Sequence, residues 1–83
     1  MVDIGSVIRA VQNLDESLQS MGVDELTDTQ RRMIFVIYFE LMREYDLTSG
    51  EIVAKTLDFY GSNGGIILEA VRSVVPRGMG LVA

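Results

Sequence analysis

The chain has 83 residues, a formal net charge of −5 and a hydrophobic fraction of 48%. That length suits one domain, and the apolar content predicts a packed core, not a disordered chain. Cysteine and histidine are both absent, which excludes disulfides, thiolate catalysis, Cys/His zinc sites and a histidine general base; the lack of cysteine also fits a cytoplasmic protein.

The first predicted helix covers residues 4–21. Its apolar residues recur at steps of three and four, which is typical of a helix that packs one stripe on a core. The stripe consists of Ile4, Val7, Ile8, Val11, Leu14, Leu18 and Met21. Asp3 is placed to cap the helix and Gly22 to end it. We expect the whole stripe to be buried.

The second predicted helix begins at Thr27 and runs to about Tyr45. Residues 27–30 (TDTQ) have the form of a capping box. The helix is apolar around most of its circumference, so we expect it to be the buried centre of the fold. Val36 and Phe39 are exceptions, because they fall in or beside its polar stripe.

Two shorter helices complete the pattern. Residues 48–51 (TSGE) form a second capping box ahead of a third helix over about 49–60, which Gly61 is expected to end. A fourth helix is predicted over about 63–75, with Ile67, Ala70, Val71 and Val74 facing inward, and Pro76 would stop it.

The predicted fold class is therefore all-α: a compact bundle of four helices, or five if the tail adds one, with a helix-turn-helix-like core. We expect residues 1–83 to form a single domain. The tail 77–83 is short and Gly-rich, so it should either lie across the core or be mobile. The longest apolar run, residues 33–39, is far shorter than the roughly 20 residues of a membrane span. With no recognisable signal peptide either, we expect no membrane association.

No catalytic, cofactor-binding or metal-binding constellation is recognisable. The Gly-rich segment 61–65 lacks the lysine of a phosphate-binding loop and does not follow a strand. The acids Asp24, Glu25 and Asp28 do not have the spacing of a calcium loop. We therefore expect a protein that is not an enzyme and that uses no cofactor and no metal.

DNA binding is the alternative that the helix order leaves open. Helices two to four follow the order of a helix-turn-helix, with the small residue Ala54 at a close-packing position. The turn 58–63 is longer than in the standard motif, and the last helix carries one base, Arg72. A DNA reader needs several cations for phosphates, so we do not expect nucleic-acid binding. In this alternative, the phosphate contacts would come from Arg31, Arg32, Arg72 and Arg77.

Protein binding is the function class that the remaining features favour. Four apolar residues, Val36, Phe39, Phe59 and Ile66, fall where the helical pattern predicts exposure, and together they suggest a contact surface. The negative charge is uneven: residues 1–28 carry six acids and one base, whereas residues 29–83 carry six of each. An acidic first third repels nucleic acid and could steer a basic protein surface. The predicted partner site includes the acids Asp24, Glu25 and Asp28.

Four short segments resemble a known family: residues 26–32 (LTDTQRR), 48–54 (TSGEIVA), 70–73 (AVRS) and 77–78 (RG). They are similar to a helix-turn-helix-like domain found in regulators of rhizobial integrative elements, and the small acidic form resembles the QseM-type quorum-sensing antiactivators. The resemblance covers roughly residues 26–80. It implies a transfer-control protein that binds transcriptional activators, including LuxR-type autoinducer receptors, and represses conjugative transfer genes by occluding them. The partner would be the activator protein, and we expect the chain itself to be a monomer.

Overall fold

The first three helices begin at the capping residues that the sequence predicts. The Asp3 side chain accepts a hydrogen bond from a backbone N–H of the first turn at 2.8 Å. Thr27 and Gln30 exchange two bonds of 2.9 and 3.1 Å, which makes a complete capping box. Thr48 and Glu51 do the same at 2.9 and 3.2 Å. Each pair satisfies backbone donors that a helix start leaves unpaired.

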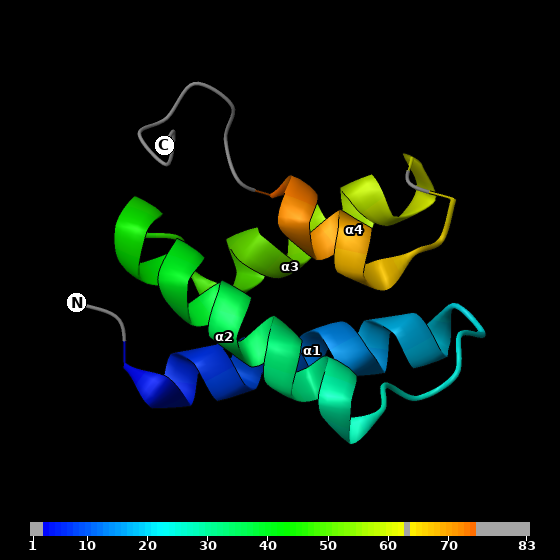
Figure 1. Ribbon diagram of the computed structural model, residues 1–83, viewed down its shortest axis with the longest axis horizontal. Helices are drawn as coiled ribbons and strands as arrows, with labels where there is room; N and C mark the ends of the chain where they lie inside the picture. Colours follow the sequence, from blue (N-terminus) through cyan, green and yellow to red (C-terminus); the bar gives the residue numbers. More distant parts are fainter. Residues whose placement is uncertain (1–2, 63, 75–83) are drawn as a thin grey trace.

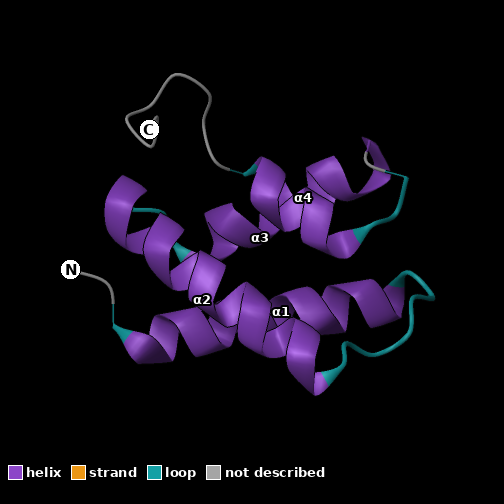
Figure 2. Cartoon of the chain, in the orientation of Figure 1, coloured by secondary structure: helices purple, strands orange, loops and turns teal. Residues whose placement is uncertain are grey.

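The structure, a computed structural model, describes residues 3–62 and 64–74. Four helices and no strand are present in these ranges: α1 (Ile4–Ser20), α2 (Asp28–Tyr45), α3 (Ser49–Ser62) and α4 (Ile67–Ser73). Figure 1 shows α2 crossing α1, with α3 and α4 packed side by side, and Figure 2 shows that only short loops join the helices. The predicted all-α bundle of four helices is confirmed.

Glycines set the ends of two helices. Gly22, with a φ of 86°, follows α1 as predicted. The prediction was wrong at the end of α3, because the helix continues through Gly61 to Ser62. Gly64 and Gly65, with φ of 68° and 79°, end it instead.

The hydrogen bonds explain where α3 ends. The Gly65 N–H donates to the Tyr60 carbonyl at 2.9 Å, and the Gly64 N–H donates to the Gly61 carbonyl at 3.3 Å. These bonds form a Schellman motif, which uses the left-handed backbone that glycine adopts readily. The glycine pair therefore belongs to the end of α3, and α4 begins only at Ile67.

The core forms where all four helices meet. Its fully buried centre includes Leu14 and Leu18 of α1, Ile34 and Tyr38 of α2, and Ile52 of α3. The predicted inward residues of α4 are all buried. They are Ile67, Ala70, Val71 and Val74.

One polar interaction lies inside this core. Thr56 is fully buried, and its hydroxyl donates to the Ile52 carbonyl at 2.8 Å. The Tyr38 hydroxyl is hydrogen-bonded to the Thr56 hydroxyl. Because the Thr56 proton is already used, the Tyr38 hydroxyl is the donor in this bond.

Two burial predictions were wrong in part. The stripe of α1 is not buried throughout, since Ile4 and Met21, at its two ends, and Ile8 are 57%, 56% and 44% exposed. Nor is α2 buried apart from its predicted exceptions, because Met33 is also 37% exposed, and Val36, as predicted, is 61% exposed. An apolar helix on the outside of a small bundle cannot cover its whole circumference. Apolar surface therefore remains open on both helices.

The capping pair Thr48–Glu51 predicts a specific pH response. The hydrogen bond from the Thr48 backbone N–H lowers the pKa of Glu51 below its usual value. A carboxyl with a lowered pKa stabilises the fold above its unfolded-state pKa, and the effect is lost as the pH falls through its folded-state pKa. A Glu51→Gln variant should therefore melt at a lower temperature than the wild type at neutral pH, and the two midpoints should converge on acidification. Thermal unfolding followed by circular dichroism measures this. Glu16→Gln, a change outside any capping pair, should show no such convergence.

None of the helices in the described ranges is long and apolar enough to span a membrane. The predictions made for the tail 77–83, and for a fifth helix there, lie outside the described residues.

Candidate functional site

The four apolar residues predicted to form a contact surface divide into two pairs. Val36 and Ile66 are 61% and 57% exposed, as predicted. Phe39 and Phe59 are half-buried and pack against the core, so the prediction that they stand free on the surface was wrong. Phe39 also packs beside Phe35 with ring centroids 6.3 Å apart. These contacts leave Val36 and Ile66 as the exposed members.

Val36 and Ile66 line two different hollows. Ile66 lies in a hollow of about 400 Å³ beside Asp24 and Glu25, which we call the acidic hollow. It is formed by the end of α1, the loop to α2, the start of α2 and the segment that leads into α4. Its lining residues are Leu18, Val23, Asp24, Glu25, Leu26, Thr27, Gln30, Tyr60, Gly65, Ile66, Ile67 and Leu68. The structure thus brings three of the seven predicted site residues together.

A cluster of charges holds the loop that carries these acids. The Arg31 guanidinium contacts Glu25 at 2.9 Å, Asp28 at 3.1 Å and Asp15 at 3.4 Å. Asp15 also accepts a hydrogen bond from the Leu26 N–H at 3.2 Å, which ties the loop to α1. Three carboxylates share one cation here, so the cluster remains net negative. The predicted steering acids Glu25 and Asp28 are therefore partly neutralised by Arg31.

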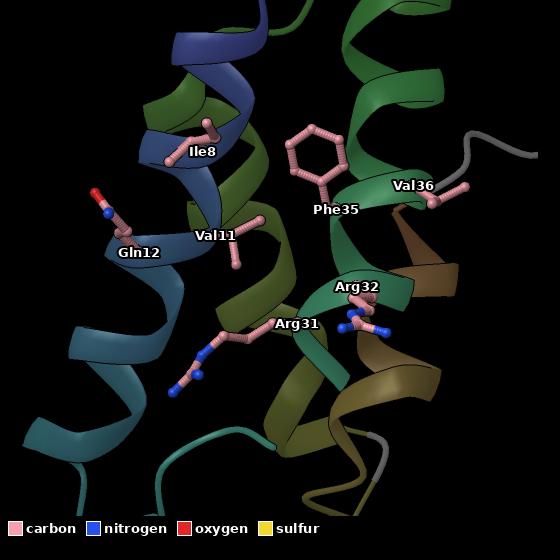
Figure 3. Close-up of a pocket in the computed structure, with 7 residues that line it drawn as sticks. All are labelled: Ile8, Val11, Gln12, Arg31, Arg32, Phe35 and Val36. Carbon is pink, nitrogen blue, oxygen red and sulfur yellow. The ribbon is translucent and has the colours of Figure 1, made fainter. Parts of the chain in front are cut away.

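Val36 belongs to a larger apolar groove of about 570 Å³ between α1 and α2, which we call the α1–α2 groove. Figure 3 shows Phe35 pointing from α2 towards α1 and Val11 pointing from α1 towards α2, while Val36 projects from the side of α2 that faces away from α1. The complete lining is Ile8, Val11, Gln12, Arg31, Arg32, Phe35 and Val36. None of these residues is acidic.

Arg32 differs from the other arginines at the two surfaces. Arg31 is surrounded by carboxylates, whereas within residues 3–62 and 64–74 no carboxylate lies in ion-pair distance of Arg32. All 12 Asp and Glu residues of the chain fall in those ranges. Arg32 is exposed, and it therefore places an uncompensated positive charge beside an apolar groove.

Helix α4 and the helix before it, which would bind DNA in the alternative function, lack the features that DNA binding needs. Helix α4 has only seven residues, and its one cation, Arg72, is paired with Glu69 at 3.4 Å. Ala54 is exposed, so it does not make the close helix contact expected of it. The predicted turn 58–63 was also wrong, since residues 58–62 are helical.

Within residues 3–62 and 64–74, no group of three or more Asp or Glu side chains is arranged to hold a metal ion.

Comparison with known proteins adds no relative: the chain matches no protein-family model, no curated protein and no solved structure.

The sequence pattern missed the residues that make the α1–α2 groove. The sequence pattern places Ile8 in the buried stripe of the first helix, and it places Phe35 in a second helix that is expected to be the buried centre of the fold. Both follow the period of a packed helix, and only the way α1 crosses α2 leaves them facing an open groove. The sequence offers Arg32 one acid three or four positions away, Asp28, and only the structure shows that Asp28 pairs with Arg31 instead.

Proposed function

We propose that this protein is an antiactivator: it binds a transcriptional activator, such as a LuxR-type quorum-sensing receptor, and prevents it from acting. The acidic hollow is the proposed contact for a basic, partly apolar surface of that activator. Occlusion of a surface that the activator needs would repress its target genes, including conjugative transfer genes.

The observation that carries this proposal is the convergence of Asp24, Glu25 and Ile66 on one hollow. Ile66 supplies an exposed apolar contact, and the two acids supply negative charge around it. Interfaces gain most of their affinity from a few apolar anchors, whereas surrounding charges raise the association rate and select the partner. A DNA-binding surface is typically basic, so the acids of the hollow suit it.

The choice of an activator as the partner rests on the sequence resemblance to QseM-type antiactivators. Direct DNA binding is the weaker candidate, because the one cation of α4 is already paired with an acid of the same helix.

The proposal is tested by mixing the protein with a LuxR-type receptor from the same genome and its promoter DNA. We expect a complex on size exclusion and release of the receptor from the promoter in a mobility-shift assay. Ile66→Asp and Asp24→Lys should each weaken the complex about tenfold or more, as expected for residues at the centre of an interface.

Ile4→Asp is the matched control, because Ile4 has the same exposed fraction as Ile66, 57%, but lies outside the acidic hollow. It should leave the complex unchanged. Circular dichroism would verify that each variant is folded. The proposal fails if no complex forms at micromolar concentrations, or if Ile4→Asp weakens it as much as Ile66→Asp does.

A further inference from the structure

The α1–α2 groove has features that the acidic hollow does not share. Its walls are apolar: Val11 is buried, Phe35 is half-buried, and Ile8 and Val36 are exposed. Ile4 extends the exposed apolar surface by one helical turn from Ile8. Ile8 of α1 and Val36 of α2 thus line one groove, and Ile4 lies one turn away, so these exposed residues form a group of the kind that marks an interaction site.

The groove lining contains a cation, Arg32, of a kind that the lining of the acidic hollow lacks. Among residues 3–62 and 64–74 no carboxylate pairs with Arg32, and the groove lining contains no acid. Arg31, the second cation of the lining, is already surrounded by three carboxylates. An occupant that supplies one carboxylate could therefore pair with Arg32.

This charge pattern argues against a second copy of the chain as the occupant. In a two-fold dimer each groove would face the same patch on the other copy. Both patches carry an unpaired Arg32 and no acid, so neither copy could neutralise the other. A different protein segment, with its own carboxylate, fits the surface better.

We propose that the α1–α2 groove docks an amphipathic helix of a partner protein, and that an acidic residue of this helix pairs with Arg32. The groove between two helices accepts the apolar stripe of a third, with contacts at positions i, i+3 or i+4, and i+7. These positions span about 10 Å along a helix, which is two turns. The carboxylate lies at the end of the stripe that meets Arg32. This site is independent of the acidic hollow, and it stands whether or not an activator binds there.

A display library of helical peptides, about four turns long and randomised on one face, tests this inference. Selection on the full chain should enrich helices that combine the apolar stripe with one Asp or Glu. Binding of an enriched, synthesised peptide should shift the backbone amide resonances of Ile8, Phe35 and Val36. Arg32→Glu should weaken that peptide about tenfold or more, and Val36→Asp should do the same.

The matched control is Arg9→Glu, which makes the same charge change on an exposed residue of α1 outside the groove lining. It should leave the affinity within about twofold, because rim charges outside a contact contribute little. A second selection on Arg32→Glu should enrich Lys or Arg in place of the acid. The inference is overturned if enriched helices carry no acid, if the acid persists on Arg32→Glu, or if the shifted resonances lie elsewhere. Loss of binding in Arg9→Glu to the same extent would overturn it as well. Since none of these variants alters the acidic hollow, the result does not depend on the antiactivator test.

Discussion

A Leu14→Ala variant should lose about 3–5 kcal/mol of unfolding free energy, the cost of removing a fully buried leucine that leaves a cavity. Leu14 has no exposed surface and lies in α1 among buried residues of the core. Small domains have only a few kcal/mol of stability in total, so this one change should leave much of the protein unfolded at room temperature. Urea unfolding followed by circular dichroism measures the loss.

Ile4→Ala provides the comparison for that experiment. Ile4 belongs to the same sequence stripe as Leu14 but is 57% exposed, so its truncation should cost less than about 1 kcal/mol. Similar losses in the two variants would contradict the packing of α1 described above.

The buried hydroxyl pair predicts an unequal response to two conservative substitutions. Thr56→Val should cost about 1–3 kcal/mol, because it removes the acceptor of a buried tyrosine hydroxyl and leaves that donor unpaired. Tyr38→Phe should cost less, about 0.5–1.5 kcal/mol, because Thr56 retains its bond to the Ile52 carbonyl. Urea unfolding of both variants and of the double variant measures the two costs and their coupling.

The double variant is the sharper test. In the Tyr38→Phe background, Thr56→Val no longer leaves a buried tyrosine hydroxyl without an acceptor. The combined loss should therefore be smaller than the sum of the two single losses. Additive losses would contradict the hydrogen bond itself, and a larger loss in Tyr38→Phe than in Thr56→Val would contradict the direction that we assign.

Local chemistry explains why much of the fold could be predicted. Capping boxes such as those at Thr27 and Thr48 are formed by residues three positions apart, so the sequence contains the whole interaction. The inward residues of α4 were predicted from helical period alone. The predicted fourth helix, residues 63–75, wrongly included Gly64 and Gly65, because a glycine pair between two helices can either end the first helix or weaken the start of the second. The hydrogen bonds to the Tyr60 and Gly61 carbonyls, which place the glycines at the end of α3, can be identified only from the structure.

The candidate sites were less predictable, for a related reason. The period of a single helix identified Val36 and Ile66 as exposed, and both are. Phe39 and Phe59 also fall beside polar stripes, yet they are half-buried because large rings reach neighbouring core residues. That Ile66 lies beside Asp24, 42 positions earlier in the chain, depends on how the loop after α1 meets the start of α4. No single-helix pattern contains that information.

The buried phenol of Tyr38 makes the fold intrinsically sensitive to base. Burial raises the pKa of Tyr38 above the usual tyrosine value. In the unfolded chain the same phenol ionises at its ordinary pKa, so each step of pH above that value favours the unfolded state. The group contributes fully below the unfolded-state pKa, and its contribution is lost as the pH rises towards the folded-state pKa. Alkaline denaturation of this protein therefore has a chemical origin at the centre of its core, where a charged tyrosinate would be buried away from water.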